Sequence, residues 1–254
     1  MVAPIVTSID HQTPTSSPTN ADSLTFRVTF SKAVSGVDTA DFTVSGTTAT
    51  VASVTQVGST NDYDVLLSGG DLASVNGSVT MAFAGGQNIA DTATTPNALT
   101  VTTPTGTNNH TYVLDNAAPT LTINTVAGDD RVNGTEDDSA VTVSGTTTVE
   151  DGQVVAVSVG ALNKTAPVTT GAWSVSLSST EVQGLTTGNV AITADVSDAT
   201  GNAATQATKT VVYDPSATLI VNTELDSGDD ATLGASLSAD MADGGGLSLR
   251  EALH

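Results

Sequence analysis

The chain has 254 residues, with 27 Asp and Glu against 6 Lys and Arg, which gives a formal net charge of -21 at pH 7. A charge of this sign and size repels nucleic acid and anionic lipid, so we expect cations as the natural partners and no nucleic acid. No apolar run approaches the roughly 18 residues of a membrane span, so no membrane insertion is expected, and the absence of Cys excludes a disulfide framework and a thiolate metal site.

The composition predicts an all-β protein. Thr, Val and Ser dominate, and Gly, Asn and Asp interrupt the chain about every eight to twelve residues, as in all-β folds. Only 3% of the residues are aromatic, so the cores must be filled by Val, Leu, Ile and Ala. Because a β-sandwich module has roughly 100 residues, the length suits two modules and a fragment; the alternative is one large sandwich.

The first expected module covers residues 1–118. Its segments alternate apolar and polar residues, as half-buried strands do. We expect an immunoglobulin-like β-sandwich with at least one strand more than the module that follows. Its expected strands, in chain order, are APIVTSI, LTFRVTF, DFTVSG, TVASVTQV, YDVLLS, SVTMAFA, ALTVTT and HTYVLD.

An internal repeat marks the module junctions. YVLDNAAPTLTINTVAGDD, Tyr112–Asp130, recurs as VVYDPSATLIVNTELDSGDD, Val211–Asp230. The aligned Asp115 and Asp214 are 214 − 115 = 99 positions apart. A strand, an Asp, a turn of small residues with Pro and a second strand suit a junction, because Pro stiffens a linker and cannot pair in a β-ladder.

The second expected module covers residues 119–215. Its strands are expected in LTINTV, AVTVSGTTT, VVAVSV, a short stretch around Pro167, AWSVSL, NVAITADV and ATKTVVY, which matches the immunoglobulin-like count. Trp173 alternates with Val175 and Leu177, which places it most simply in the core. The alternative, a surface Trp that stacks on carbohydrate, would suit a carbohydrate-binding module.

The last segment, residues 216–254, is too short for a sandwich. It holds the apolar run TLIVNT, an acidic loop, the glycines Gly244–Gly246 and LSLREALH. We expect a partial third unit that packs on a neighbour, pairs with another chain or begins a truncated domain.

Several strings resemble a known family. FRVTFSKAVSGVDTADFTVSG with the later NIADTA, and DNAAPTLTI, VTVSGTT and DVSDATGN, resemble the immunoglobulin-like repeats of very large bacterial surface adhesins and biofilm-associated proteins. The resemblance extends from Ala3 to Asp214. It implies an extracellular, cell-surface stalk or adhesive module, often stiffened by calcium, whose partners are neighbouring modules of the same chain and a distal host or biofilm surface. TLIVNTELDSGDD with LSLREALH separately resembles the opening of bacterial surface domains that continue as parallel β-helices.

Acidic clusters are the candidate cation sites, because Ca²⁺ takes six to eight oxygen ligands from carboxylates and carbonyls. Successive loops of a sandwich lie at alternate ends, which predicts two groups of acids in the second module. The group expected to face the first junction is Asp115, Glu150, Asp151, Asp195 and Asp198. The group expected at the opposite end is Asp129, Asp130, Asp137, Asp138 and Asp214. A Ca²⁺ ion at each junction would neutralise these charges and fix the angle between modules; the alternative is that the acids are solvated turn residues.

No enzyme is expected. His11, His110 and His254 have no acidic or nucleophilic partner at a recognisable spacing, and no catalytic or phosphate-binding motif is present. The leading hypothesis is therefore a calcium-stiffened stalk that holds a distal binding region away from the cell. The alternative is a self-assembling subunit of an extracellular filament or surface layer, in which TLIVNT or the leading APIVTSI adds to a sheet edge of another copy.

Overall fold

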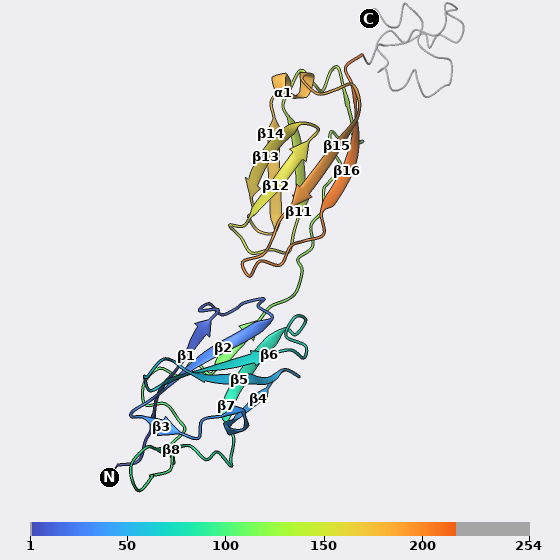
Figure 1. Ribbon diagram of the computed structural model, residues 1–254. Helices are drawn as coiled ribbons and strands as arrows, with labels where there is room; N and C mark the ends of the chain where they lie inside the picture. The colour runs from blue at the N-terminus through green and yellow to red at the C-terminus, as the bar shows by residue number, and fades with distance from the viewer. Residues whose placement is uncertain (1, 217–254) are drawn as a thin grey trace, which may run out of the picture.

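The computed structural model describes residues 2–216, which form two β-sandwiches joined end to end (Figure 1). Module 1 is the sandwich that contains β1 to β9, and module 2 contains β10 to β16. The expected fold class, tandem immunoglobulin-like sandwiches in an elongated arrangement, is confirmed. The expected third unit lies in residues 217–254, outside the described part of the chain.

Module 1 packs a four-stranded sheet against a three-stranded one, in the strand order of a constant-type immunoglobulin domain. The first sheet has the order β1 (Val6–Thr13), β2 (Ser23–Phe30), β6 (Asp62–Ser68) and β5 (Thr50–Gln56). The second has the order β4 (Phe42–Ser45), β7 (Gly77–Phe83) and β9 (Thr111–Leu114). A small ribbon of β3 (Val34–Ser35) and β8 (Ala90–Asp91) and a 3-10 turn, η1 (Thr39–Asp41), complete it.

Alternation along the strands builds the core of module 1. In β2 every second side chain is buried, which orients the sheet. The rings of Phe26 and Tyr112 meet edge to face with their centroids 4.9 Å apart. The few aromatic residues of the chain thus concentrate in this core, with Phe30, Phe42 and Tyr63 also buried.

One expected strand of module 1, ALTVTT, is wrong. Residues 98–103 form only isolated bridges, such as the parallel bridge between Val101 and Ile5. Pro104 has no N–H, which interrupts regular pairing at this point. The chain that follows, residues 105–109, covers the free edge of β1, where Gly106 N donates to Thr7 O at 2.9 Å. The leading APIVTSI is therefore paired on both sides, with β2 and with this segment.

Module 2 has a five-stranded and a two-stranded sheet. The larger has the order β10 (Arg131–Asn133), β16 (Ala207–Asp214), β15 (Gly188–Asp195), β12 (Val154–Val159) and β13 (Leu162–Pro167). The smaller pairs β11 (Val141–Thr146) with β14 (Ala172–Leu177), and the short helix α1 (Ser179–Gln183) follows β14. This helix is far too short to cross a membrane, and no other helix in residues 2–216 could do so.

The first strand of module 2 divides between the two sheets. The expected LTINTV lies beside β11, where Thr122 N donates to Thr146 O at 2.9 Å. Further along, β10 pairs in parallel with β16 on the opposite sheet. The sequence did not predict β10, because a strand of three residues with only one apolar side chain, Val132, carries no alternation.

Trp173 lies in the core of module 2. Its side chain is 2% exposed and stands directly opposite Gly145 across the β11–β14 pair. This burial excludes the alternative of a carbohydrate-stacking surface, so the core interpretation is confirmed. Its ring nitrogen Nε1 has no hydrogen-bond partner among the described residues, which shows that packing decides its position.

Candidate inter-module joint

The chain crosses between the modules through a short linker. Asn116 is held by module 1, because its Nδ2 donates to the carbonyls of Leu72 at 3.0 Å and Val75 at 2.7 Å. On the other side, Thr120 N donates to Thr148 Oγ1 of module 2 at 2.9 Å. The residues between these anchors, Ala117 to Pro119, are the connection itself.

A tight loop of module 2, Asp198–Asn202, lies against this linker. The Asp198 carboxylate organises the loop: its Oδ1 accepts from Thr200 N at 2.9 Å and Asn202 N at 2.8 Å. Gly201 has a φ of 98°, a backbone conformation that glycine adopts without strain. Asp198 is 9% exposed. Burial acts to raise the pKa of its carboxyl, but the hydrogen bonds from Asn202 and Thr200 outweigh it and the pKa is lowered.

This loop, with Asn20 of module 1, makes the hydrogen bonds between the modules. Asn202 Nδ2 donates to Asp115 O at 2.8 Å, and Thr200 Oγ1 lies 3.4 Å from the same carbonyl. Asn20 Nδ2 of module 1 donates to Asn202 Oδ1 at 3.3 Å. Asn20 is placed by its neighbour Thr19, which exchanges hydrogen bonds with β9 and the start of the linker. We call these residues, Asn20, Asp115, Asp198, Thr200 and Asn202, the joint.

Two of the acids predicted to face Asp115 reach this loop. Asp198 forms it, and Glu150 Oε2 accepts from Ala199 N at 3.2 Å. The other two bond within module 2: Asp151 accepts from Gly171 N at 3.4 Å, and Asp195 accepts from Gln206 Nε2 at 2.9 and 3.0 Å. The Asp115 carboxylate itself accepts from Ala117 N at 3.0 Å, so only its backbone carbonyl meets the loop.

The acids predicted at the opposite end of module 2 each have a donor of their own. Asn133 of β10 is in register with Asp214 of β16, so the turn that follows Asn133 lies beside Asp214. The acceptor and donor pairs are Asp129 with Arg131 N, Asp130 with Lys209 Nζ, Asp137 with Tyr213 Oη, Asp138 with Gln183 Nε2, and Asp214 with Ser216 N. The ion pair with Lys209 and a backbone hydrogen bond from Val126 lower the pKa of the Asp130 carboxyl.

The joint has the oxygen chemistry of a calcium site but not the convergence of one. Carbonyl and carboxylate oxygens of Asp115, Glu150 and Asp198 are the donor type that Ca²⁺ prefers. Within residues 2–216, however, no group of three or more His, Cys, Asp or Glu side chains is placed to hold a metal ion. The Asp198 carboxylate is already satisfied by protein N–H and O–H groups.

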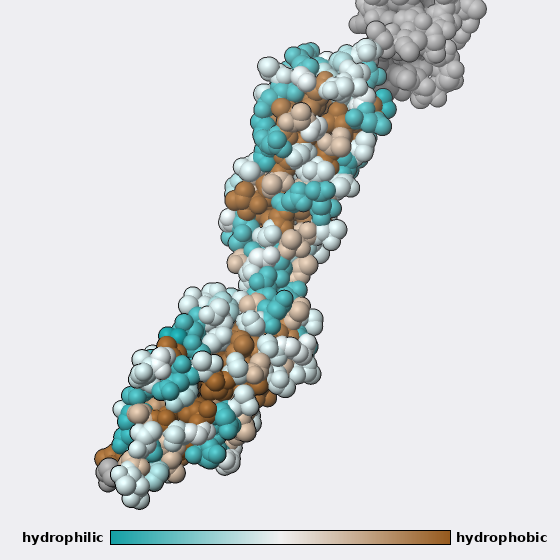
Figure 2. Space-filling model, in the orientation of Figure 1, coloured by the Kyte–Doolittle hydropathy of each residue, from teal (hydrophilic) through white to brown (hydrophobic). Residues whose placement is uncertain are grey.

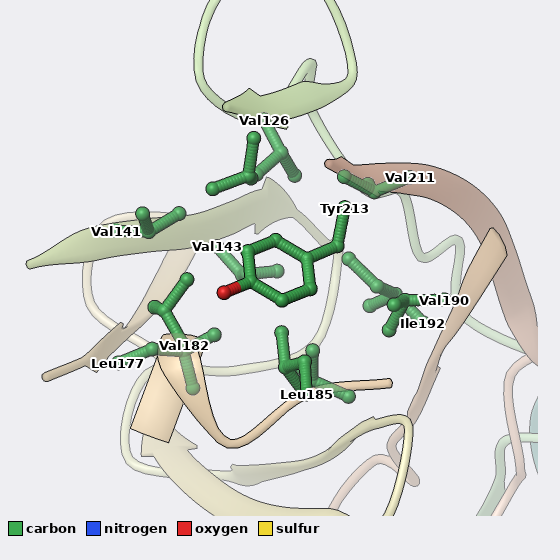
Figure 3. A pocket seen from close by; sticks show the side chains of 12 residues that line it. Val126, Val141, Val143, Leu177, Val182, Leu185, Val190, Ile192, Val211 and Tyr213 are labelled. Atoms are coloured by element: carbon green, nitrogen blue, oxygen red, sulfur yellow. The ribbon is translucent and has the colours of Figure 1, made fainter. Parts of the chain in front are cut away.

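A cavity in module 2 is unsuited to a ligand. It has room for about 20 Å³ and is lined by core side chains around Tyr213, among them Val126, Val143 and Ile192 (Figure 3). Its lining is apolar, and the Tyr213 hydroxyl already donates to Asp137 at 2.8 Å. A void of this size and lining is a packing defect that stays dry.

Sequence reasoning missed the uncharged residues of the joint. Acidic clusters directed attention to carboxylates, whereas Asn20, Thr200 and Asn202 make the contacts between modules. The available signal was the string DATGN, residues 198–202, in which an Asp precedes a Gly by three positions in a turn-forming composition.

No protein-family model and no curated protein matches the chain. Among solved structures, an immunoglobulin-like domain from the M. primoryensis ice-binding adhesin is 29% identical, with 38% of this chain and 96% of that domain covered and a TM-score of 0.30. A Ca²⁺-stabilised adhesin of an Antarctic bacterium is 21% identical over 84% of this chain and 50% of its own, with a TM-score of 0.48. A 1.5-MDa bacterial ice-binding adhesin is 24% identical over 84% of this chain and 65% of its own, with a TM-score of 0.46.

Structural matches therefore extend across most of the chain to bacterial ice-binding adhesins, as the sequence resemblance predicts. The chain spans about half to two thirds of the two longer structures. At TM-scores below 0.5 these likenesses do not bear on a ligand of this chain. The class that the fold itself defines is a tandem immunoglobulin-like β-sandwich protein.

Proposed function

We propose that this chain is a spacer in the stalk of a bacterial cell-surface adhesin, where it holds a distal binding region away from the cell. The observation that carries the proposal is the joint: two sandwiches lie end to end and hydrogen-bond across a short linker (Figure 1). We place the module boundaries at residues 118 and 215. The role is mechanical and involves no catalysis.

The surface is consistent with an extracellular spacer. On the face shown in Figure 2, hydrophilic and weakly polar side chains cover most of both modules, with smaller groups of hydrophobic ones between them. With a net charge of -21, copies of the chain repel one another in solution, which favours separate, extended rods.

Calcium at the joint is the finer part of the proposal. Asp115, Glu150 and Asp198 are its first ligands, since they share the loop that meets the linker. The remaining predicted acids are weaker candidates, because their hydrogen bonds are to groups outside this loop. Extracellular modules bind Ca²⁺ at roughly 10⁻⁴ to 10⁻³ M, and an ion at tenfold its dissociation constant adds about 1.4 kcal/mol of stability.

Small-angle scattering tests the spacer. The full chain should scatter as a monomeric rod, and its maximum dimension should be that of two modules end to end. A compact particle would contradict the proposal. For calcium, the thermal midpoint should rise on titration, and Asp198→Asn with Glu150→Gln should remove the rise. A thermal midpoint that does not change with calcium concentration would contradict the calcium site but not the spacer function.

The alternative function is self-assembly by strand addition, for which the sequence offered two candidate strands. One of them is not free to add to another copy. The leading APIVTSI is paired on both sides inside module 1. The other candidate strand, TLIVNT at residues 218–223, lies outside the described residues. Electron microscopy distinguishes the two functions: filaments of the full chain that vanish when residues 216–254 are deleted would support assembly, whereas single rods support the spacer.

A further inference from the structure

We infer that the side-chain amide of Asn202 locks the angle between the two modules, so that protein hydrogen bonds fix the joint even when no metal ion is bound. The inference rests on the proposed spacer function and deepens it. It assigns the Asp198–Asn202 loop as the surface of module 2 that docks on the end of the preceding module.

The groups that face one another across the joint are hydrogen-bond acceptors. Module 1 presents the carbonyl oxygen of Asp115, and module 2 presents the carboxylate of Asp198. Two acceptors cannot bond to each other, and a carbonyl dipole and a carboxylate repel. A hydrogen-bond donor or a cation must therefore stand between them, and the structure supplies a donor.

Asn202 Nδ2 is that donor. It lies 2.8 Å from Asp115 O and 2.9 Å from Asp198 Oδ2. The amide has two hydrogens, so one can go to each module. Thr200 contributes less, because its hydroxyl has a single hydrogen and its Oγ1 lies 2.8 Å from Asp198 Oδ1 but 3.4 Å from Asp115 O.

The orientation of the Asn202 amide is fixed by Asp115 O and Asp198 Oδ2, which can only accept hydrogen bonds. Asn202 Oδ1 accepts from Asn20 Nδ2 of module 1 at 3.3 Å. A flipped amide would set its oxygen against these two acceptors and lose both hydrogen bonds. One side chain thus uses its donor and its acceptor groups on module 1, while Asp198 holds it in module 2.

Both partners of Asn202 are held by hydrogen bonds within their own module. Asp198 is 9% exposed and also accepts from two backbone N–H groups of its own loop. On module 1, Asp115 N donates to Thr19 O at 3.0 Å, which fixes the strand end that carries the carbonyl. Docking therefore orders few additional groups, and this lowers its entropic cost.

The test measures the distribution of inter-module distances in the full chain. Because the chain has no Cys, Thr55→Cys in β5 and Thr165→Cys in β13, both exposed strand positions, can carry a pair of spin labels. The variants are Asn202→Ala and the isosteric Asn202→Asp, which sets a carboxylate against two acceptors. Asn189→Asp, an exposed position on β15, is the control of equal charge. The thermal transition of Trp173 fluorescence verifies that module 2 remains folded.

In chelator, the unsubstituted protein should give one narrow distance peak. Both Asn202 variants should raise the population outside that peak about fivefold, as the loss of one net hydrogen bond would, and Asn189→Asp should not. A broad distribution in the unsubstituted protein, or an unchanged peak in either folded Asn202 variant, would overturn the inference. If Asn202→Ala unfolds module 2, Asn20→Ala replaces it, with a smaller broadening expected and an unchanged peak again decisive against the lock.

The same measurement separates this inference from the calcium proposal. A peak that is narrow in chelator and unchanged by calcium supports the amide lock and contradicts stiffening by metal. A peak that is broad in chelator and narrowed by calcium contradicts the lock and supports the metal. If calcium narrows the distance distribution of the Asn202→Asp variant alone, the result supports the lock, because the ion then takes the place of the lost hydrogen-bond donor.

Discussion

At the scale of single residues, each module buries a tyrosine from its last strand and satisfies the hydroxyl internally. Tyr112 donates to Pro14 O at 2.6 Å in module 1, and Tyr213 donates to Asp137 Oδ2 at 2.8 Å in module 2. The second contact matters more, because Asp137 is 5% exposed and its charge needs donors. Asp137, which the sequence predicted as a cation ligand, is instead a buried partner of a core tyrosine.

Replacing Tyr213 with Phe tests this contact. The variant keeps the ring that fills the core and removes the donor from a buried carboxylate, which should cost about 1–3 kcal/mol in the free energy of unfolding. Urea unfolding followed by Trp173 fluorescence measures the change. Tyr112→Phe is the control, since it lies in the other module and should leave the Trp173 transition in place. An unchanged transition in Tyr213→Phe would mean that the hydroxyl contributes nothing.

The same tyrosines predict a loss of stability at alkaline pH. Burial raises the pKa of Tyr112 to about 12, and burial together with the Asp137 carboxylate raises the pKa of Tyr213. Above the unfolded tyrosine pKa near 10 the folded state binds more protons than the unfolded state, so stability falls as pH rises through the folded values. Urea midpoints measured from about pH 9 to 11 should decline, and the double variant Tyr112→Phe with Tyr213→Phe should decline less.

At the scale of elements, the pairing of β11 with β14 depends on one glycine. A side chain at Gly145 would place its Cβ 1.9 Å from Thr122 O and 2.6 Å from the Trp173 ring. Gly145 thus lets the first strand of module 2 and the indole both approach β11. Alternation alone marks β11 as a strand, but only the packing shows why this position must be Gly.

Gly145→Ala should therefore destabilise module 2 by about 2–3 kcal/mol, because neither the backbone oxygen nor the buried indole can give way without moving a strand. Calorimetry measures the shift in the module 2 transition. Gly85→Ala in module 1, where a Cβ would meet nothing within 4 Å, is the matched substitution and should change stability little. Equal effects of the two substitutions would contradict the packing argument.

The strands that alternation predicted are those that cover a core. β2, β12 and β14 bury every second side chain, and the sequence located all three. Alternation gave the wrong prediction at two places where pairing is irregular. Residues 98–103 have the composition of a strand but form only isolated bridges, whereas β10 lacks the composition and pairs because β16 offers it a free edge.

At the scale of the whole molecule, the two cores are separate. The buried cluster of module 1 and that of module 2 share no residue, and the modules meet through the few hydrogen bonds of the joint. We therefore expect two unfolding transitions in calorimetry, since so small a contact cannot couple two cores. Trp173 fluorescence should follow only one of them, and Asn202→Ala should change the free energy of unfolding of each module by no more than about 1 kcal/mol. A single transition common to all probes would show stronger coupling.

The candidate site was only partly accessible to sequence reasoning. Loop order placed Asp198 and Glu150 at the end of module 2 that meets Asp115, and the structure has both there. Asp151 and Asp195 belong to loops at the same end of module 2, but their carboxylates accept hydrogen bonds from groups within module 2. Topology gives the end of a sandwich on which a residue lies; it does not give the partner, which depends on side-chain geometry over a few ångströms.

The sequence alone determined the all-β class, the two modules and their order, because strand periodicity and a repeat of a whole junction are properties of the chain itself. Because Asp, Glu, Ser and Thr are abundant, the composition also predicted carboxylate and hydroxyl groups at any joint between modules. Only the tertiary structure decided what holds the joint together. Asn20 and Asn202 are 182 positions apart, and nothing short of the folded arrangement shows that an uncharged amide, rather than the neighbouring acids, bridges the two modules.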